Sequence, residues 1–194
     1  EKASVEAIES AKRCAAKIAE ALRVAEEAAL AEEEQRAAEA ARREEAIEEA
    51  REHAAKAELI LNECAEQRSK RSGALLEEIP EAAVTSQAAG EEAFKRASEL
   101  CAEVTRFSEE AESQDTAAKA REHCDLCIET LNQLRKETEL SLEKLDEAIR
   151  LTQEAEEQRA RAEAEAARIE AEALESARES ARDHSTRAGE SVAL

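Results

Sequence analysis

The fold is decided by residues 2–71, which read KASVEAIESAKRCAAKIAEALRVAEEAALAEEEQRAAEAARREEAIEEAREHAAKAELILNECAEQRSKR and contain neither glycine nor proline. A second run without either residue extends from Thr116 to Arg187. Glycine and proline are the residues that most disfavour the interior of a helix. Each run therefore predicts one continuous helix, about 105 Å long at about 1.5 Å per residue.

The segment between the two runs contains three residues that disfavour a helix, Gly73, Pro80 and Gly90. Gly73 is suited to end the first long helix, and Pro80 can open a short helix to about Ala89, closed by Gly90. A further helix is expected from about Glu91 to Ser113. The polar residues 113–116 then supply a turn and an N-cap for the second long helix.

The composition favours a narrow core. Hydrophobic residues make up 42% of the chain, but aromatic residues make up 1%, and most of the apolar content is alanine. Alanine favours helices but buries little area, which indicates a coiled coil or slim bundle rather than a globule. High charge and low hydropathy are also typical of disorder, but disordered chains do not exclude glycine and proline over such lengths.

Apolar residues of the first run recur at the alternating steps of three and four that are typical of coiled coils. They are Ile8, Ala11, Ala15, Ile18, Leu22, Ala25 and Ala29. The pattern thins across residues 32–45 and is expected to resume in a shifted phase. The resumed series is Ile47, Ala50, Ala54, Ala57, Leu61 and Cys64.

The second run has a leucine-rich half and an alanine-rich half. Its expected core face comprises Ala120, Cys124, Cys127, Leu131, Leu134, Thr138, Leu142, Leu145 and Ile149, and then narrows to Ala155, Ala162, Ala166, Ile169 and Ala173. The middle segment offers a matching face of Phe94, Ala97, Cys101, Val104, Phe107 and Ala111.

These patterns predict an all-α fold, an extended antiparallel bundle of two long helices of about 70 residues with shorter helices packed at the connected end. The chain 1–194 is expected to be one elongated domain. Its parts are a long helix (1–72), a head insertion (73–115), a second long helix (116–188) and a tail (189–194). Ile18 would face the region of Ala173 in a two-helix stem, and both chain ends would leave at one pole.

The chain carries a net charge of −20, which disfavours binding to nucleic-acid phosphate and to anionic lipid. The cations Arg68, Lys70 and Arg71 are expected to complement the negative end of a helix dipole before Gly73. We therefore expect no nucleic-acid partner.

The cysteines are the candidate site residues. Cys124 and Cys127 form a Cys-x-x-Cys pair beside His123, and the antiparallel topology would bring Cys64 and Cys101 to the same end of the bundle. This head cluster could form disulfides, remain as buried thiols, bind zinc or act in redox chemistry. Cys14 is far from these four cysteines in the expected bundle and is expected to be a free thiol.

No sequence motif indicates catalysis. The chain contains no phosphate-binding glycine loop and no His-Glu-x-x-His pattern, and the carboxylate clusters are typical of a solvated helix face. His53 and His184 are expected to be solvated. We expect no enzyme activity, no cofactor, no metal and no small-molecule substrate.

A resemblance to a known family rests on four features of the sequence. They are the alanine- and glutamate-rich stretch from Ala160 to Ala167, the two expected long helices with a helical insertion, the cysteines, and a start without methionine. The chain resembles the glutamic acid/alanine-rich surface proteins of African trypanosomes, which are similar in architecture to variant surface glycoproteins. The resemblance implies an extracellular, non-enzymatic coat protein, packed against neighbouring coat molecules or a second copy. It implies attachment to the insect-stage membrane by a glycosylphosphatidylinositol anchor, whose signal would lie beyond Leu194.

Two other classes stay open on sequence grounds. An intracellular coiled-coil scaffold or spacer would share the helical pattern and keep its cysteines reduced. A helical-bundle surface receptor for a host ligand would need an exposed apolar or aromatic patch.

Overall fold

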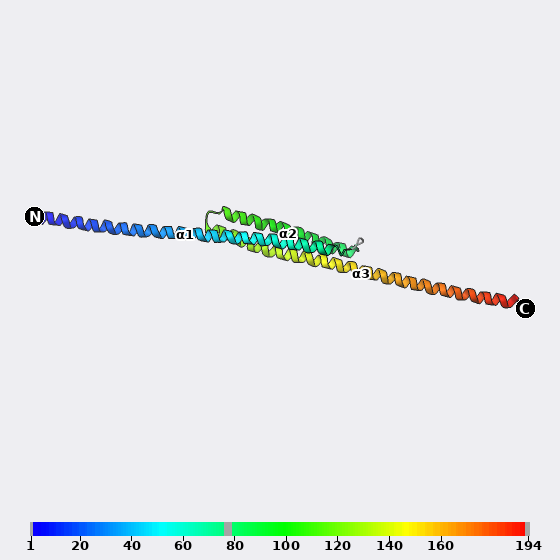
Figure 1. Cartoon of the computed structure of the whole chain (residues 1–194). Coiled ribbons are helices and arrows are strands. Elements are labelled where there is room, and N and C mark those ends of the chain that lie inside the picture. The colour runs from blue at the N-terminus through cyan, green and yellow to red at the C-terminus, as the bar shows by residue number, and fades with distance from the viewer. Residues whose placement is uncertain (1, 76–78, 193–194) are drawn as a thin grey trace. The chain divides into compact units, whose positions relative to one another are not determined.

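The structure, a computed structural model, describes the backbone of residues 2–75 and 79–192 and the side chains of residues 9–75 and 79–184. Over these ranges the chain forms the helices α1 (Lys2–Ser72), α2 (Glu81–Ser113) and α3 (Ala117–Val192), and no strand (Figure 1). The predicted all-α fold is confirmed. α3 continues past Gly189 to Val192, so most of the expected tail is helical.

The helix ends follow the local chemistry of the sequence. α1 stops at Ser72, directly before Gly73. The carbonyl oxygen of Pro80 accepts from the amides of Ala83 and Val84 at the start of α2, because proline suits the first turn of a helix. The Thr116 hydroxyl accepts from the Lys119 amide at 3.4 Å, which is the geometry of an N-cap.

The middle of the chain forms one helix, so the expected break at Gly90 is wrong. α2 has 33 residues and Gly90 lies inside it. A Cβ atom on Gly90 would lie 3.1 Å from the Ser141 carbonyl oxygen and 3.3 Å from the Lys144 Cβ. The glycine therefore permits close helix packing and does not end the helix.

The chain divides into two compact units. Unit 1 comprises Glu1–Asn62 and Arg96–Lys136, and unit 2 comprises Glu63–Lys95 and Glu137–Leu194. Each unit contains parts of all three helices.

In unit 1, α1 and α3 run in the same direction. The Glu39 carboxylate accepts from the Ala117 amide at 3.0 Å, and further along both helices Glu49 pairs with Arg121. Residue numbers thus rise together in the two helices. α2 runs the opposite way, since the Cys127 thiol meets the Val104 carbonyl oxygen and His123 lies beside the later residue Glu110.

Unit 2 shows the same direction independently. The Cys64 thiol lies 3.8 Å from the Thr138 carbonyl oxygen, and Arg71 pairs with Asp146 at 2.6 Å. The predicted antiparallel arrangement of the two long helices is therefore wrong in both units. The physical reason is the uninterrupted α2, which reverses the direction of the chain between α1 and α3 in each unit. The expectation that both termini leave at one pole depended on this antiparallel pairing and therefore loses its basis.

The core of unit 1 is thin and built from small side chains. Its largest fully buried side chains include Leu134 and Val104. The buried cluster contains Ala50, Ala57, Cys101, Val104, Ala111, Cys124, Cys127, Leu131 and Leu134. The predicted core face of residues 94–111 is confirmed at Ala97, Cys101, Val104 and Ala111, which are all buried.

Two charged side chains of α1 hold the turn between α2 and α3. The Arg43 guanidinium donates to the carbonyl oxygens of Gln114 at 2.6 Å and Glu112 at 2.9 Å. Glu39 accepts from the Ala117 amide. A cation thus meets the carbonyl end of α2 and a carboxylate meets the amide end of α3, which satisfies groups that helix ends leave open.

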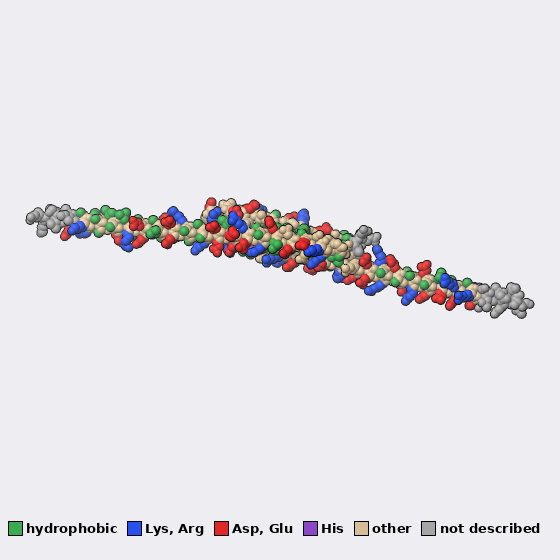
Figure 2. Space-filling view, in the orientation of Figure 1, with side chains coloured by type: hydrophobic (Ala, Val, Ile, Leu, Met, Phe, Trp, Pro, Cys, Tyr) green, Lys and Arg blue, Asp and Glu red, His purple; other side chains and the backbone are tan. Residues whose placement is uncertain are grey.

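Residues 9–42 of α1, named the α1 arm, are exposed at every position. Ile18 and Leu22 are 60% and 59% exposed, so the expected burial of this stretch in a stem is wrong for the described residues. Figure 2 shows acidic, basic and apolar side chains interspersed along this arm. In unit 2, residues 156–184 of α3, the α3 arm, are exposed in the same way.

Candidate functional site

Three of the four cysteines expected in the head cluster lie together in unit 1. Cys101 projects from α2, and Cys124 and Cys127 project from successive turns of α3 into the same buried cluster. The Cys127 thiol donates to the Val104 carbonyl oxygen at 3.6 Å, and the Cys124 thiol donates to the Glu49 carboxylate at 3.6 Å. The spacing of three residues in the Cys-x-x-Cys pair places both thiols on the face that packs against α1 and α2.

Burial makes these thiols poor nucleophiles. It raises the pKa of Cys124 to about 11, against a smaller opposing effect of Arg121. Burial likewise raises the pKa of Cys127 to about 11, with a further contribution from the neighbouring Cys124. The thiolate is the reactive and metal-binding form of cysteine, so both side chains stay protonated and unreactive at neutral pH.

The remaining two cysteines lie elsewhere. Cys64 belongs to unit 2, where burial raises the pKa of its thiol and the Thr138 carbonyl oxygen is its contact. Cys14 is exposed on the α1 arm, and all five cysteines have free thiols. Among the described residues, no group of three or more His, Cys, Asp and Glu side chains is placed to hold a metal ion.

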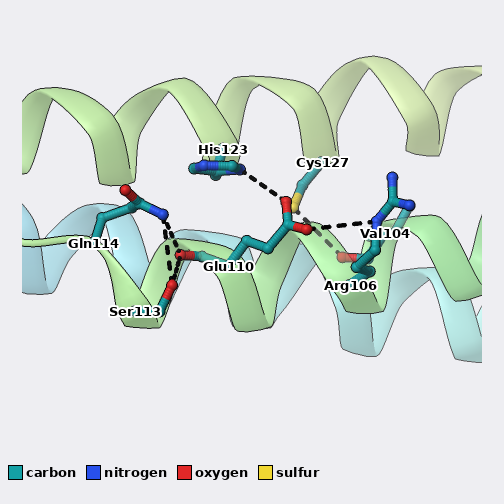
Figure 3. A network of polar contacts seen from close by, with 7 residues as sticks. All are labelled: Val104, Arg106, Glu110, Ser113, Gln114, His123 and Cys127. Carbon is teal, nitrogen blue, oxygen red and sulfur yellow. Dashed lines mark hydrogen bonds and ion pairs between the residues drawn. The ribbon is translucent and has the colours of Figure 1, made fainter.

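His123, the residue beside the Cys-x-x-Cys pair, belongs to a polar network between α2 and α3 (Figure 3). Its Nδ1 atom lies 3.3 Å from a Glu110 carboxylate oxygen, although without the alignment of a hydrogen bond. The other carboxylate oxygen lies 3.7 Å from Arg106. The Arg106 guanidinium stacks 4.8 Å above the Phe107 ring, and the same ring lies 6.5 Å from that of His123.

This network joins α2 to α3. Glu110 also accepts from the Gln114 side chain through its backbone oxygen at 3.0 Å, so the residue connects the end of α2 to α3. Sequence reasoning missed the contact. The sequence patterns assigned His123 no neighbour beyond the cysteines of the expected cluster, whereas the packing of α2 against α3 brings Glu110 to it.

A second network, in unit 2, was also missed. Arg68 of α1 donates to the Gly90 carbonyl oxygen at 3.0 Å and lies over the Phe94 ring at 5.1 Å. The Ser141 hydroxyl of α3 donates to the same carbonyl oxygen at 2.8 Å. Arg68 therefore binds a neighbouring helix. Its expected role was to complement the dipole at the end of its own helix.

The isolated histidines differ in their surroundings. His53 is half-buried, and burial is the main cause that lowers its pKa; its Nδ1 atom has no hydrogen-bond partner among the described residues. The expectation that His53 is solvated is therefore wrong. His184 is exposed, as expected.

The hollow beside the α2–α3 turn of unit 1 is an open groove lined mainly by charged side chains. Its walls comprise Glu32, Gln35, Arg36, Glu39, Ala40, Arg43 and Asp115. Glu39 and Arg43 are already occupied by the turn. The groove therefore offers surface charge without a sheltered place for chemistry.

No protein-family model matches the chain, and no characterised protein or solved structure is detectably similar to it. Within the described residues, no helix is long and apolar enough to cross a lipid bilayer.

Proposed function

We propose that the chain is a non-enzymatic structural protein that acts through the surface of its helices. The observation that carries this proposal is the α1 arm, a single helix that exposes Ile18 and Leu22 at coiled-coil spacing. In proteins, a helix gains most of its stability from packing an apolar face against a neighbour. A long arm with such a face open is suited to association and spacing.

The non-enzymatic part of the proposal is supported by the state of the cysteines. Cys124 and Cys127 are the side chains with the most specific chemical pattern, and both are fully buried with raised pKa values. They contribute to packing in the seam, where a small apolar side chain fits. The groove beside the turn is open, and two of its charged side chains, Glu39 and Arg43, already bind the turn.

The setting that we propose is a cell-surface coat. It is supported by the resemblance to the glutamic acid/alanine-rich surface proteins of African trypanosomes and by the net charge of −20, since acidic neighbours repel one another and keep an even lateral spacing. In this setting the chain is extracellular and the protein is held to the insect-stage membrane by a lipid anchor. Neighbouring coat molecules are its partners.

Surface labelling tests this setting. Antibodies raised against residues 117–184 should stain intact cells that produce the protein, and phosphatidylinositol-specific phospholipase C should release the protein into the medium. Staining that requires permeabilised cells would contradict a coat. A cytosolic protein of similar abundance provides the control for membrane integrity.

An intracellular scaffold or spacer is the second candidate, favoured by the free and exposed thiol of Cys14. Free exposed thiols persist in reducing compartments. In that case a membrane-permeant alkylating reagent should modify Cys14 in intact cells, and a charged, impermeant reagent should not. Modification by the impermeant reagent would favour the coat instead.

A further inference from the structure

The α1 arm carries an open continuation of the buried seam of unit 1. Ala46 and Ala50 are buried in that unit. Whole heptads counted back from Ala46 reach Ala25, Ile18 and Ala11. Whole heptads counted back from Ala50 reach Ala29, Leu22 and Ala15. The predicted phase shift is thus absent, and one heptad register serves both the covered and the uncovered part of α1.

A polar stretch separates the two parts of the seam. The same heptad register places Glu32, Arg36, Glu39 and Arg43 at seam positions. Glu39 and Arg43 hold the α2–α3 turn, while Glu32 and Arg36 pair with each other at 3.2 Å. The apolar seam of the arm is therefore a separate surface, which ends before the three-helix part of unit 1 begins.

The charges of this surface balance, unlike those of the chain. Residues 9–30 contain four carboxylates and four cations, whereas the chain carries −20. Apart from Glu9 and Arg23, the two signs are also separated along the helix. The cations Lys12, Arg13 and Lys17 come first, and the carboxylates Glu20, Glu26 and Glu27 follow. When two copies of such a segment lie antiparallel, the cations of each copy lie near the carboxylates of the other.

We propose that the α1 arm is the binding surface for the α1 arm of a second copy of this chain, in an antiparallel coiled coil centred between Ile18 and Leu22. Ile18 of one copy packs against Leu22 of the other, and the reverse contact repeats it by symmetry. Ala15 meets Ala25 and Ala11 meets Ala29. The large side chains lie at the centre, and the alanines on either side let the helices approach closely.

The flanking charges select the antiparallel direction. Lys12 and Glu26 each come directly after a seam residue, Ala11 and Ala25, and these two seam residues hold the same heptad position. In an antiparallel pair, Lys12 of each copy therefore lies beside Glu26 of the other. Neither side chain has an ion pair or hydrogen bond to another described residue, whereas Arg23 is already paired within the arm with Glu20 and Glu27. In a parallel pair, the flank of Glu26 would face the alanine at position 21, without charge complementarity.

The α3 arm is a poorer partner. Residues 156–184 contain nine carboxylates and five cations, so two such arms would repel each other. Its continuation of the α3 seam carries one large apolar side chain, Ile169, which is 57% exposed. Residues 9–30 of the α1 arm are neutral and carry two large side chains at the centre of their seam, so this segment is the surface that self-association covers.

The inference rests on the proposed structural function, because it names the partner through which the arm acts. The mass of the full chain in solution tests it. Sedimentation equilibrium should give twice the chain mass of 21.2 kDa. Ile18→Glu and Leu22→Glu should each weaken dimerisation by more than about 100-fold, since each change places charge at the seam twice per dimer.

Matched controls lie on the same arm. Val24 and Leu30 are 53% and 61% exposed, close to the 60% of Ile18, but stand outside the seam positions. Val24→Glu and Leu30→Glu should therefore leave the dimer intact. A monomeric unmodified chain at about 100 μM overturns the proposal. So does dissociation by Ile169→Glu with no effect of Ile18→Glu, since the interface would then involve the α3 arm.

Cross-linking tests the direction. In a Cys14→Ser background, chains with Ala15→Cys and chains with Ala25→Cys are oxidised alone and as a mixture. An antiparallel pair forms a disulfide in the mixture, because a disulfide needs Cα atoms about 4.4 to 6.8 Å apart. Cross-linking of Ala15→Cys chains with themselves, and none in the mixture, overturns the antiparallel direction.

The two proposals fail in distinguishable ways. A monomeric chain that is nevertheless labelled on intact cells overturns the pairing and leaves the coat setting in place. A dimer that is reached by antibody after permeabilisation alone overturns the coat setting and leaves the pairing in place.

Discussion

The carbonyl oxygen of Gly90 in α2 accepts hydrogen bonds from two other helices of unit 2, from Arg68 of α1 at 3.0 Å and from Ser141 of α3 at 2.8 Å. A helix carbonyl already accepts from an amide of its own helix. The extra donors fit because Gly90 has no side chain to hold α3 away. One residue thus connects all three helices of unit 2.

Arg68→Met should destabilise the chain by about 2 kcal/mol, because a hydrogen bond from a charged donor contributes about 1.5 to 3 kcal/mol. Urea unfolding followed by circular dichroism measures the change. Lys70→Met is the matched control, since the Lys70–Glu66 pair is exposed and exposed pairs contribute about 0.5 kcal/mol or less. Equal losses in the two variants would contradict the role given to Arg68.

Gly90→Ala should destabilise the chain by about 1 kcal/mol even though alanine is the better helix former. The change gains about 1 kcal/mol of helix propensity, but the new methyl group meets the backbone of Ser141 at 3.1 Å, and overpacking of this kind costs about 1 to 3 kcal/mol. Gly73→Ala is the control, because its Cβ would lie 3.8 Å from the nearest atom, the Lys70 carbonyl oxygen. A gain in stability for Gly90→Ala would show that α3 moves aside freely.

The long helices and their ends could be predicted from the sequence because each depends on nearby residues. The absence of glycine and proline, Pro80 before α2 and Thr116 before α3 act within a turn or two. The direction of α3 could not be predicted in the same way. It depended on whether Gly90 ends a helix, and the packing of Ser141 against Gly90 is a contact between distant parts of the chain.

In the candidate site, too, the features that depend on nearby residues could be predicted and the contacts between helices could not. The burial of Cys124 and Cys127 followed from their heptad positions. The surroundings of His123 did not, since the contact with Glu110 joins two helices and does not follow from the heptad pattern of either helix alone. The roles of Glu39 and Arg43 were equally hidden, because in the sequence they are two charges among many on a helix that is mostly solvated.

Arg43→Ala should destabilise unit 1 by about 3 kcal/mol. The change removes two hydrogen bonds from a charged donor to the carbonyl oxygens of Glu112 and Gln114, each worth about 1.5 kcal/mol or more when the donor is charged. Arg36→Ala is the control, because Arg36 is exposed and pairs with Glu32 one turn away. The amide hydrogens of residues 117–120 should exchange faster in Arg43→Ala. Unchanged exchange would contradict the clamp on the turn.

Thiol titration should separate one cysteine from the other four. Cys14 is exposed and the others are buried, so a disulfide-exchange reagent such as Ellman's reagent should react rapidly with one thiol per chain. Cys14→Ser should remove this rapid phase. In denaturant without a reducing agent, all five thiols should react. Fewer than five would show that disulfides form in the protein and would contradict the free thiols.

Stability should fall as the pH rises from about 9 to about 11. In the folded chain burial raises the pKa of Cys124 and Cys127 to about 11, from an ordinary value of 9.0. The folded state therefore holds thiol protons that the unfolded state has already released in this range. By linkage, their contribution is fully present below about pH 9 and is lost as the pH approaches 11.

A double variant separates this effect from the titration of lysine side chains. The loss between pH 9 and 11 should be on the order of 3 kcal/mol in the unmodified chain, measured by urea unfolding under reducing conditions. Cys124→Ala/Cys127→Ala removes both thiols and keeps small apolar side chains in the seam, so its stability should change much less over the same range. An identical pH dependence in the two proteins would place the cause in other groups, and would mean that the thiols of the seam reach water far more easily than their burial indicates.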